Sequence, residues 1–165
     1  EFVAFYDHFD TLLKAHAMPS VSWMEIPSFG RMHIPSCDFS TMVSPRHFRK
    51  FIWPGLAAEC LAMTHNIFHM DGKGVAQHLD AILELPNVQA IQWVQGVADD
   101  LPIMQWTPLL RKIQDAGKSV VVDLQLAELD PFVAEMRPEG IFICVATHNE
   151  EQEHAVIRTL EKWAH

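Results

Sequence analysis

Apolar and polar positions along the chain follow helical and strand spacing in turn. Apolar residues three or four apart predict helices at about 2–13, 45–64, 75–85, 107–116, 131–136 and 150–163. Apolar or alternating runs predict five strands, at 21–26, 66–70, 88–94, 118–124 and 140–146. Because strands and helices alternate at this spacing, the pattern predicts βα units and a parallel sheet. We expect one α/β domain over residues 1–165.

Prolines, glycines and capping residues set the expected limits of these elements. Pro27, Gly30 and Pro35 predict a loop over 27–38, and Pro54 is expected to kink or break the helix that contains it. Gly117 stands where a glycine C-cap is expected, and Asn149 with Gln152 resembles a capping box. The segments between the predicted helices and strands are therefore short, and none is expected to be a linker to a second domain.

Composition narrows the class of protein. The chain is 49% hydrophobic and 20% charged, as expected for a globular domain, and its net charge is −9. An acidic chain without a basic stripe is not expected to bind nucleic acid. Its apolar runs are shorter than the roughly 18 residues of a membrane span, so no membrane partner is expected. With three cysteines, no CxxC pair and no signal-peptide pattern, we expect a cytoplasmic protein.

Two stretches carry a resemblance to a known family. They are "DFSTMVSPRHFRKFIWPGL" (38–56) and "NIFHMDGKGVAQHLDAILELPNVQAIQWVQG" (66–96). They contain an aspartate before a helix that begins with Ser-Pro, a proline within that helix, and a strand that ends in H-x-D-G. From about Val21 to its end the chain resembles the uroporphyrinogen decarboxylase superfamily, which also contains the cobalamin- or corrinoid-dependent methyltransferases.

The resemblance implies a (β/α)8 barrel, which takes about 250 residues when complete. Five strands in 165 residues cannot close such a barrel. We therefore expect a partial TIM (β/α)8-type barrel, the C-terminal portion of the family fold, and its opening within a helical pattern fits a shortened chain. The exposed sheet edges are expected to be covered by a missing N-terminal half-barrel or by a homo-oligomer.

Candidate site residues follow from the rule that such barrels bind and react at the C-terminal ends of their strands. Polar residues emerge there from the apolar runs: Glu25, His69, Asp71, Gln95, Asp123, Cys144, Thr147 and His148. We expect catalytic roles for His69, Asp71, Glu25, Asp123 and His148. Alternatively, Asp123 caps a loop and His148 lies on the surface. The remaining helical histidines are expected on solvated faces: His8, His16, His47, His78 and His154.

A zinc site is a further expectation. In the zinc-dependent methyltransferase branch of the superfamily that the chain resembles, an H-x-C strand end and a cysteine in the last strand bind zinc, which activates a thiol. His69, Asp71 and Cys144 stand at the corresponding positions, with Asp71 in place of a thiolate. Imidazole, carboxylate and thiolate are all zinc ligands, and three of them leave a position for substrate. In the alternative, Cys144 is a buried structural thiol and His69 with Asp71 orients or protonates a substrate.

The resemblance also implies which activities are expected of the chain. Porphyrinogen decarboxylation in the family uses an arginine-rich N-terminal segment and an aspartate that lie upstream of this chain, so this polypeptide alone is not expected to catalyse it. We expect a decarboxylase-like lyase or methyltransferase that acts on a small-molecule or corrinoid-linked substrate, the corrinoid partner being implied by resemblance alone. The rival hypothesis is a truncated, non-catalytic half-barrel that binds a ligand or partner.

Overall fold

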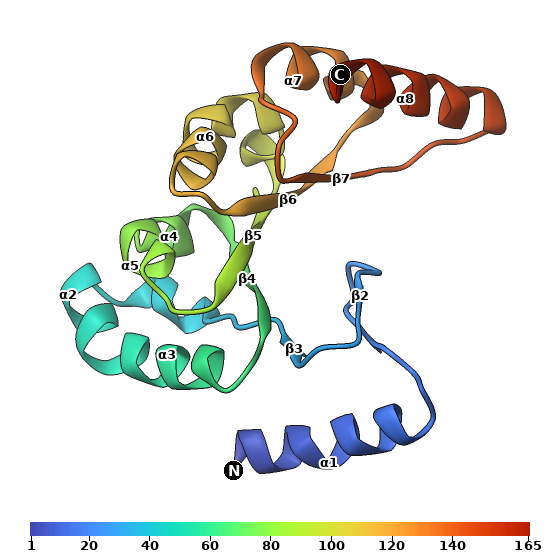
Figure 1. Cartoon of the computed structure of the whole chain (residues 1–165). Helices are drawn as coiled ribbons and strands as arrows, with labels where there is room; N and C mark the ends of the chain where they lie inside the picture. Colours follow the sequence, from blue (N-terminus) through green and yellow to red (C-terminus); the bar gives the residue numbers. More distant parts are fainter.

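The computed structural model describes all of residues 1–165 and has a five-stranded parallel sheet at its centre (Figure 1). The strands are β3 (Met32–His33), β4 (His65–Asp71), β5 (Val88–Val94), β6 (Ser119–Leu124) and β7 (Ile141–Val145). Their order in the sheet is their order in the chain, and every pairing is parallel. The predicted α/β fold with five parallel strands is confirmed, and the open sheet corresponds to part of a barrel.

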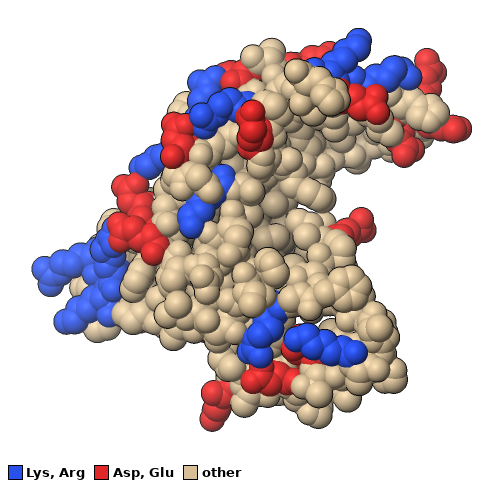
Figure 2. All heavy atoms as spheres, viewed as in Figure 1, with Lys and Arg blue, Asp and Glu red and all other residues tan.

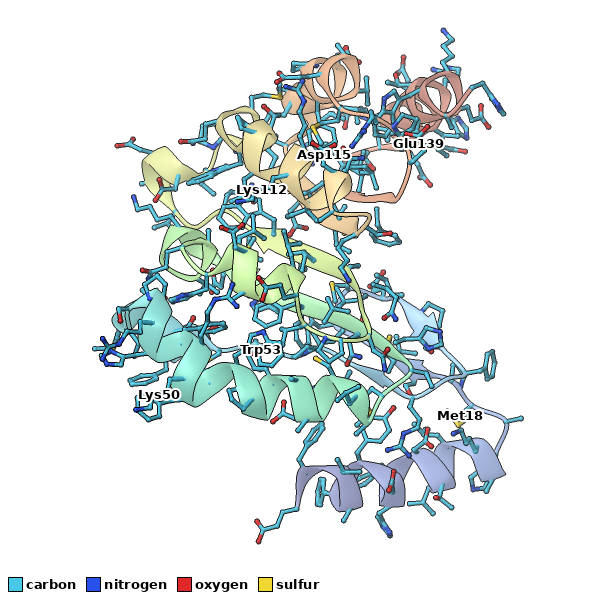
Figure 3. The ribbon with its side chains drawn as sticks, turned by 60° about the vertical axis from the view of Figure 1, so that its left-hand side comes forward. Met18, Lys50, Trp53, Lys112, Asp115 and Glu139 are labelled. Atoms are coloured by element: carbon cyan, nitrogen blue, oxygen red, sulfur yellow. The ribbon has the colours of Figure 1, made fainter.

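One or two helices follow each strand of the sheet and cover one of its faces (Figure 1). These helices are α2 (Pro45–His47), α3 (Trp53–Leu61), α4 (Gly72–Ala76), α5 (Leu79–Leu83), α6 (Thr107–Asp115), α7 (Leu129–Glu135) and α8 (Glu150–Trp163). Trp53, the first residue of α3, links this helix to α5, because its Nε1 donates to the Ala81 carbonyl at 2.8 Å (Figure 3). The main core, of 24 buried residues, lies between these helices and the sheet. No helix is both long and apolar enough to cross a membrane.

The two faces of the sheet differ in their covering. Phe68 and Met70 of β4 pack into the main core. Ile67 and His69 alternate with them and therefore face the opposite side. On that side a cluster of only four buried residues forms, made of Met24, Ile67, Ala90 and Val121. We call this side the open face, because no helix covers it.

The first predicted strand, 21–26, is wrong. The segment forms a turn between β1 (Ser20–Val21) and β2 (Pro27–Ser28), which pair with each other antiparallel. Ser22 N donates to Ile26 O at 3.1 Å and Glu25 N donates to Ser22 O at 3.0 Å. These local bonds hold Glu25 at φ 58°, a left-handed conformation that a strand cannot contain.

The predicted loop at 27–38 is also wrong in part, because it contains β3. Met32 and His33 pair with His65 and Asn66 of β4, and this long-range pairing outweighs the weak strand propensity of a proline-rich segment. Before β1 the chain forms α1 (Phe2–Ala15), as expected from its apolar spacing. The sheet thus has the expected number of strands with a different first member.

Pro54 and Gly117 act as their chemistry predicts. A π-helical turn, Phe48–Ile52, comes just before Pro54 and widens the helix where the proline removes a backbone donor. Gly117 has φ 72°, and its N–H donates to Gln114 O at 2.8 Å, which forms the predicted C-cap. At the start of α8, Asn149 Oδ1 accepts from Gln152 N at 2.9 Å, as the capping pattern predicts.

His78 is not on a solvated face, so its predicted placement is wrong. Its side chain is buried at the break between α4 and α5 and stacks on Phe48, with ring centroids 4.3 Å apart. Nε2 donates to the Ser40 carbonyl at 2.9 Å. Helical periodicity misplaced it because the helix is interrupted there, which turns the ring inward. The other four histidines of this group are exposed, as expected.

Candidate active site

Several side chains near the strand ends are accessible on the open face, where His69 and Cys144 are half-buried and Asp123 is exposed. Figure 2 shows the molecule hollowed between α8 and the β1–β2 segment, and few charged side chains are visible there. The β1–β2 turn lies over this face through Met24. The residues on either side of Met24, Trp23 and Glu25, reach two different groups of sheet residues.

His69 forms the first of these groups with Gln92 and Trp23. His69 pairs with Gln92 across β4 and β5, and its Nδ1 lies 2.7 Å from Gln92 Oε1. Trp23 Nε1 donates to the same oxygen at 3.3 Å. The indole meets the imidazole edge to face, with centroids 5.4 Å apart and an interplanar angle of 89°. His69 is half-buried, so its ring is held on one side and remains reachable on the other.

Trp23 and Gln92 are absent from the residues predicted from sequence. Gln92 lies in the run "VQAIQWV", where alternation puts it on the same face as Ala90, opposite Trp93. A buried glutamine on an otherwise apolar strand face was the available signal. No sequence signal indicates Trp23, because its position depends on the β1–β2 turn.

Glu25, Asp123 and Cys144 form the second group. Asp123 and Cys144 are register partners on β6 and β7, and both line a hollow of about 860 Å³ together with Glu25 and Phe142. Burial, followed by the negative charges of Asp123 and Glu25, raises the pKa of the Cys144 thiol. The thiol is therefore kept neutral, and the two carboxylates give this end of the open face a negative charge.

The side chains of the other predicted residues form no hydrogen bond with the side chains of either group. Asp71 is the exposed last residue of β4, and its side chain makes no capping bond to α4. His148 is exposed beyond β7, and its N–H donates to Gln152 Oε1 at 2.9 Å. Gln95 is buried, and its side chain donates to the Asp123 and Leu101 carbonyls, which indicates a structural role. The structure thus joins Glu25 with Asp123 and leaves His148 separate.

The predicted zinc ligands are not brought together. No group of three or more histidine, cysteine, aspartate or glutamate side chains is placed to hold a metal ion. His69 and Asp71 lie on β4 and Cys144 on β7, with β5 and β6 between them. At about 4.8 Å per strand the backbones are roughly 14 Å apart, whereas zinc–ligand bonds are about 2 Å long. The three residues do not fit a zinc ion in this arrangement.

Comparison of the chain with protein-family models, with curated proteins and with solved structures finds no match.

Proposed function

We propose that the chain is the C-terminal part of a uroporphyrinogen decarboxylase-like barrel and carries out methyl transfer or decarboxylation on a small or corrinoid-linked substrate. The observation that carries the proposal is the position of His69 on the open face, near the carboxyl end of a parallel strand and hydrogen-bonded to a buried glutamine. In α/β sheets and barrels this is the end at which ligands bind.

His69 supplies the acid–base chemistry of the proposal, since imidazole gains and loses protons near neutral pH. In methyl transfer, a thiol acceptor gives its proton to His69 and its sulfur lone pair forms the new C–S bond. The electron pair of the broken bond stays with the methyl donor. In decarboxylation, carbon dioxide leaves its C–C electron pair on the substrate carbon, which takes a proton from His69. A corrinoid, when bound, supplies the methyl group.

The lining of the hollow favours a substrate without many negative charges. Glu25 and Asp123 are its charged residues, and neither lysine nor arginine lines it. A polycarboxylate would meet repulsion there, whereas the apolar side chains suit a small neutral group: Met24, Leu124, Phe142, Ile143, Val145 and Ala146. Asp71, two residues beyond His69, is the proposed second polar contact at the strand end.

Two probe reactions test the proposal: loss of the methyl–cobalt absorbance of methylcobalamin with a simple thiol, and release of carbon dioxide from a carboxylated pyrrole. We expect turnover of one probe by the parent chain and a loss of at least tenfold in His69→Gln, since general acid–base groups contribute about 10²–10⁴ in rate. His65→Gln is the matched control, because His65 is exposed at the opposite end of β4. Equal rates in the parent and His69→Gln would contradict the role of His69.

The alternative is a non-catalytic half-barrel that binds a second copy of the chain. Its support is the outer edge of β7, which has no neighbouring strand and contains neither lysine nor proline to block pairing. The opposite edge of the sheet differs from that of β7, because α1 lies beside β3 there, through the Asp7–Arg31 ion pair and the contact of Phe2 with His33. A chain inert with both probes and dimeric by light scattering would favour this alternative. A monomer with turnover would contradict it.

A further inference from the structure

The hydrogen bonds around His69 identify which of its ring nitrogens carries the proton. Gln92 Oε1 lies 3.3 Å from Trp23 Nε1 and 2.7 Å from His69 Nδ1. An indole N–H can only donate, so the Gln92 atom that faces it must be the carbonyl oxygen rather than the amide nitrogen. The same oxygen faces His69, so Nδ1 must be the donor there.

We infer that Gln92, oriented by Trp23, fixes His69 in the tautomer that carries its proton on Nδ1 and leaves Nε2 as the reacting nitrogen. The inference rests on the proposed function only in taking His69 as the acid–base group. Gln92 and Trp23 are positioning residues, since they act through His69. Second partners of this kind set tautomer and ring orientation at many histidine sites.

Burial and neighbouring contacts hold His69, Gln92 and Trp23 in this one arrangement. The Gln92 side chain is buried, so water competes poorly for its oxygen. The backbone of His69 is fixed from the other side, because its N–H donates to Pro35 O at 2.9 Å and Ser36 forms a parallel bridge with it. The Trp23 ring packs against the imidazole edge to face. The hydrogen bond to Gln92 and the contact with the Trp23 ring therefore oppose the rotation of the imidazole that would exchange its two nitrogens.

The test is the tautomer ratio of ¹⁵N-labelled histidine side chains, measured by long-range NMR correlations above the pH at which the ring is charged. In the parent chain we expect the Nδ1–H form of His69 in roughly five- to tenfold excess, the bias of one hydrogen bond. Gln92→Leu removes the acceptor at similar size, and the ratio should fall by the same factor. Gln92→Glu keeps an acceptor oxygen and should restore the Nδ1–H form.

Two further variants keep the test decisive. Trp23→Phe removes the indole donor that orients the amide and should reduce the Nδ1–H excess. Gln95→Leu removes another buried glutamine, which bonds only backbone carbonyls, and should leave the ratio unchanged. If Gln92→Leu does not fold, Gln92→Glu and Trp23→Phe carry the comparison.

An Nε2–H form in the parent, or a ratio that Gln92→Leu does not move, would overturn the inference. The outcome is independent of turnover. If the Nδ1–H form is found while His69→Gln leaves both probe reactions unchanged, the proposed function fails and the positioning role stands.

Discussion

At Glu25, the effect of backbone strain on the free energy of unfolding can be separated from the effect of the carboxylate charge. The φ of this residue, 58°, lies in the left-handed region, and its carboxylate is exposed beside the hollow that contains Asp123 and Cys144. The left-handed conformation costs a non-glycine residue about 1–2 kcal/mol. Glycine avoids this cost but loses about 0.5–1 kcal/mol more conformational entropy on folding. Glu25→Gly should therefore raise the free energy of unfolding by about 0.5–1 kcal/mol.

Urea unfolding of three variants measures this effect. Glu25→Gln removes the charge and keeps the strain, so its free energy of unfolding should stay within about 0.5 kcal/mol of the parent value. Ala98→Gly is the matched control, because Ala98 has φ 52° and begins the short 3-10 helix Ala98–Asp100, away from the β1–β2 turn. It should gain about as much as Glu25→Gly. A loss of more than about 1 kcal/mol in Glu25→Gly alone would refute the reasoning, because it would show that the glutamate side chain stabilises the turn.

Two further predictions concern thiols. Burial, with a smaller contribution from Glu59, raises the pKa of Cys60 from near 9 to about 11, so the folded chain keeps this thiol protonated where the unfolded chain ionises it. The free energy of unfolding should fall by about 2 kcal/mol from this group as pH rises from 9 to 11, and urea unfolding of Cys60→Ala across that range should lack this part of the fall. Asp123→Asn removes a charge that raises the pKa of Cys144, so labelling of Cys144 by a thiol reagent at pH 8 should be faster than in the parent chain. Unchanged labelling would show that burial alone keeps the thiol neutral.

The parts of the fold that local chemistry determines were predictable from sequence. Gly117 follows the end of α6 and Asn149 caps the start of α8, because caps satisfy backbone groups within a few residues. The burial of His78 was not predicted, because it depends on tertiary contacts: its ring stacks on Phe48 and donates to the Ser40 carbonyl. β3 was missed for a similar reason, since its two residues form a strand only through their pairing with β4.

The candidate site was predictable only in part. His69 was identified because ligands generally bind at the carboxyl ends of parallel strands. The sequence pattern predicts where each strand ends, so it also predicts this location. Its partners Gln92 and Trp23 come from β5 and from the β1–β2 turn, 23 and 46 residues away in the sequence. Cys144 was grouped with His69 because the family resemblance implies a zinc site at these positions, but two strands separate them in the sheet.

The central claim is that the ligand binds on the open face, and methionine methyl NMR tests it most directly. Met24 lies on the open face, whereas Met70 and Met136 belong to the core on the helix side. Titration with methylcobalamin, and separately with a carboxylated pyrrole, should shift the Met24 methyl signal with one of the probes and leave Met70 and Met136 in place. A saturable shift confined to Met70 or Met136, or no shift with either probe, would contradict the account.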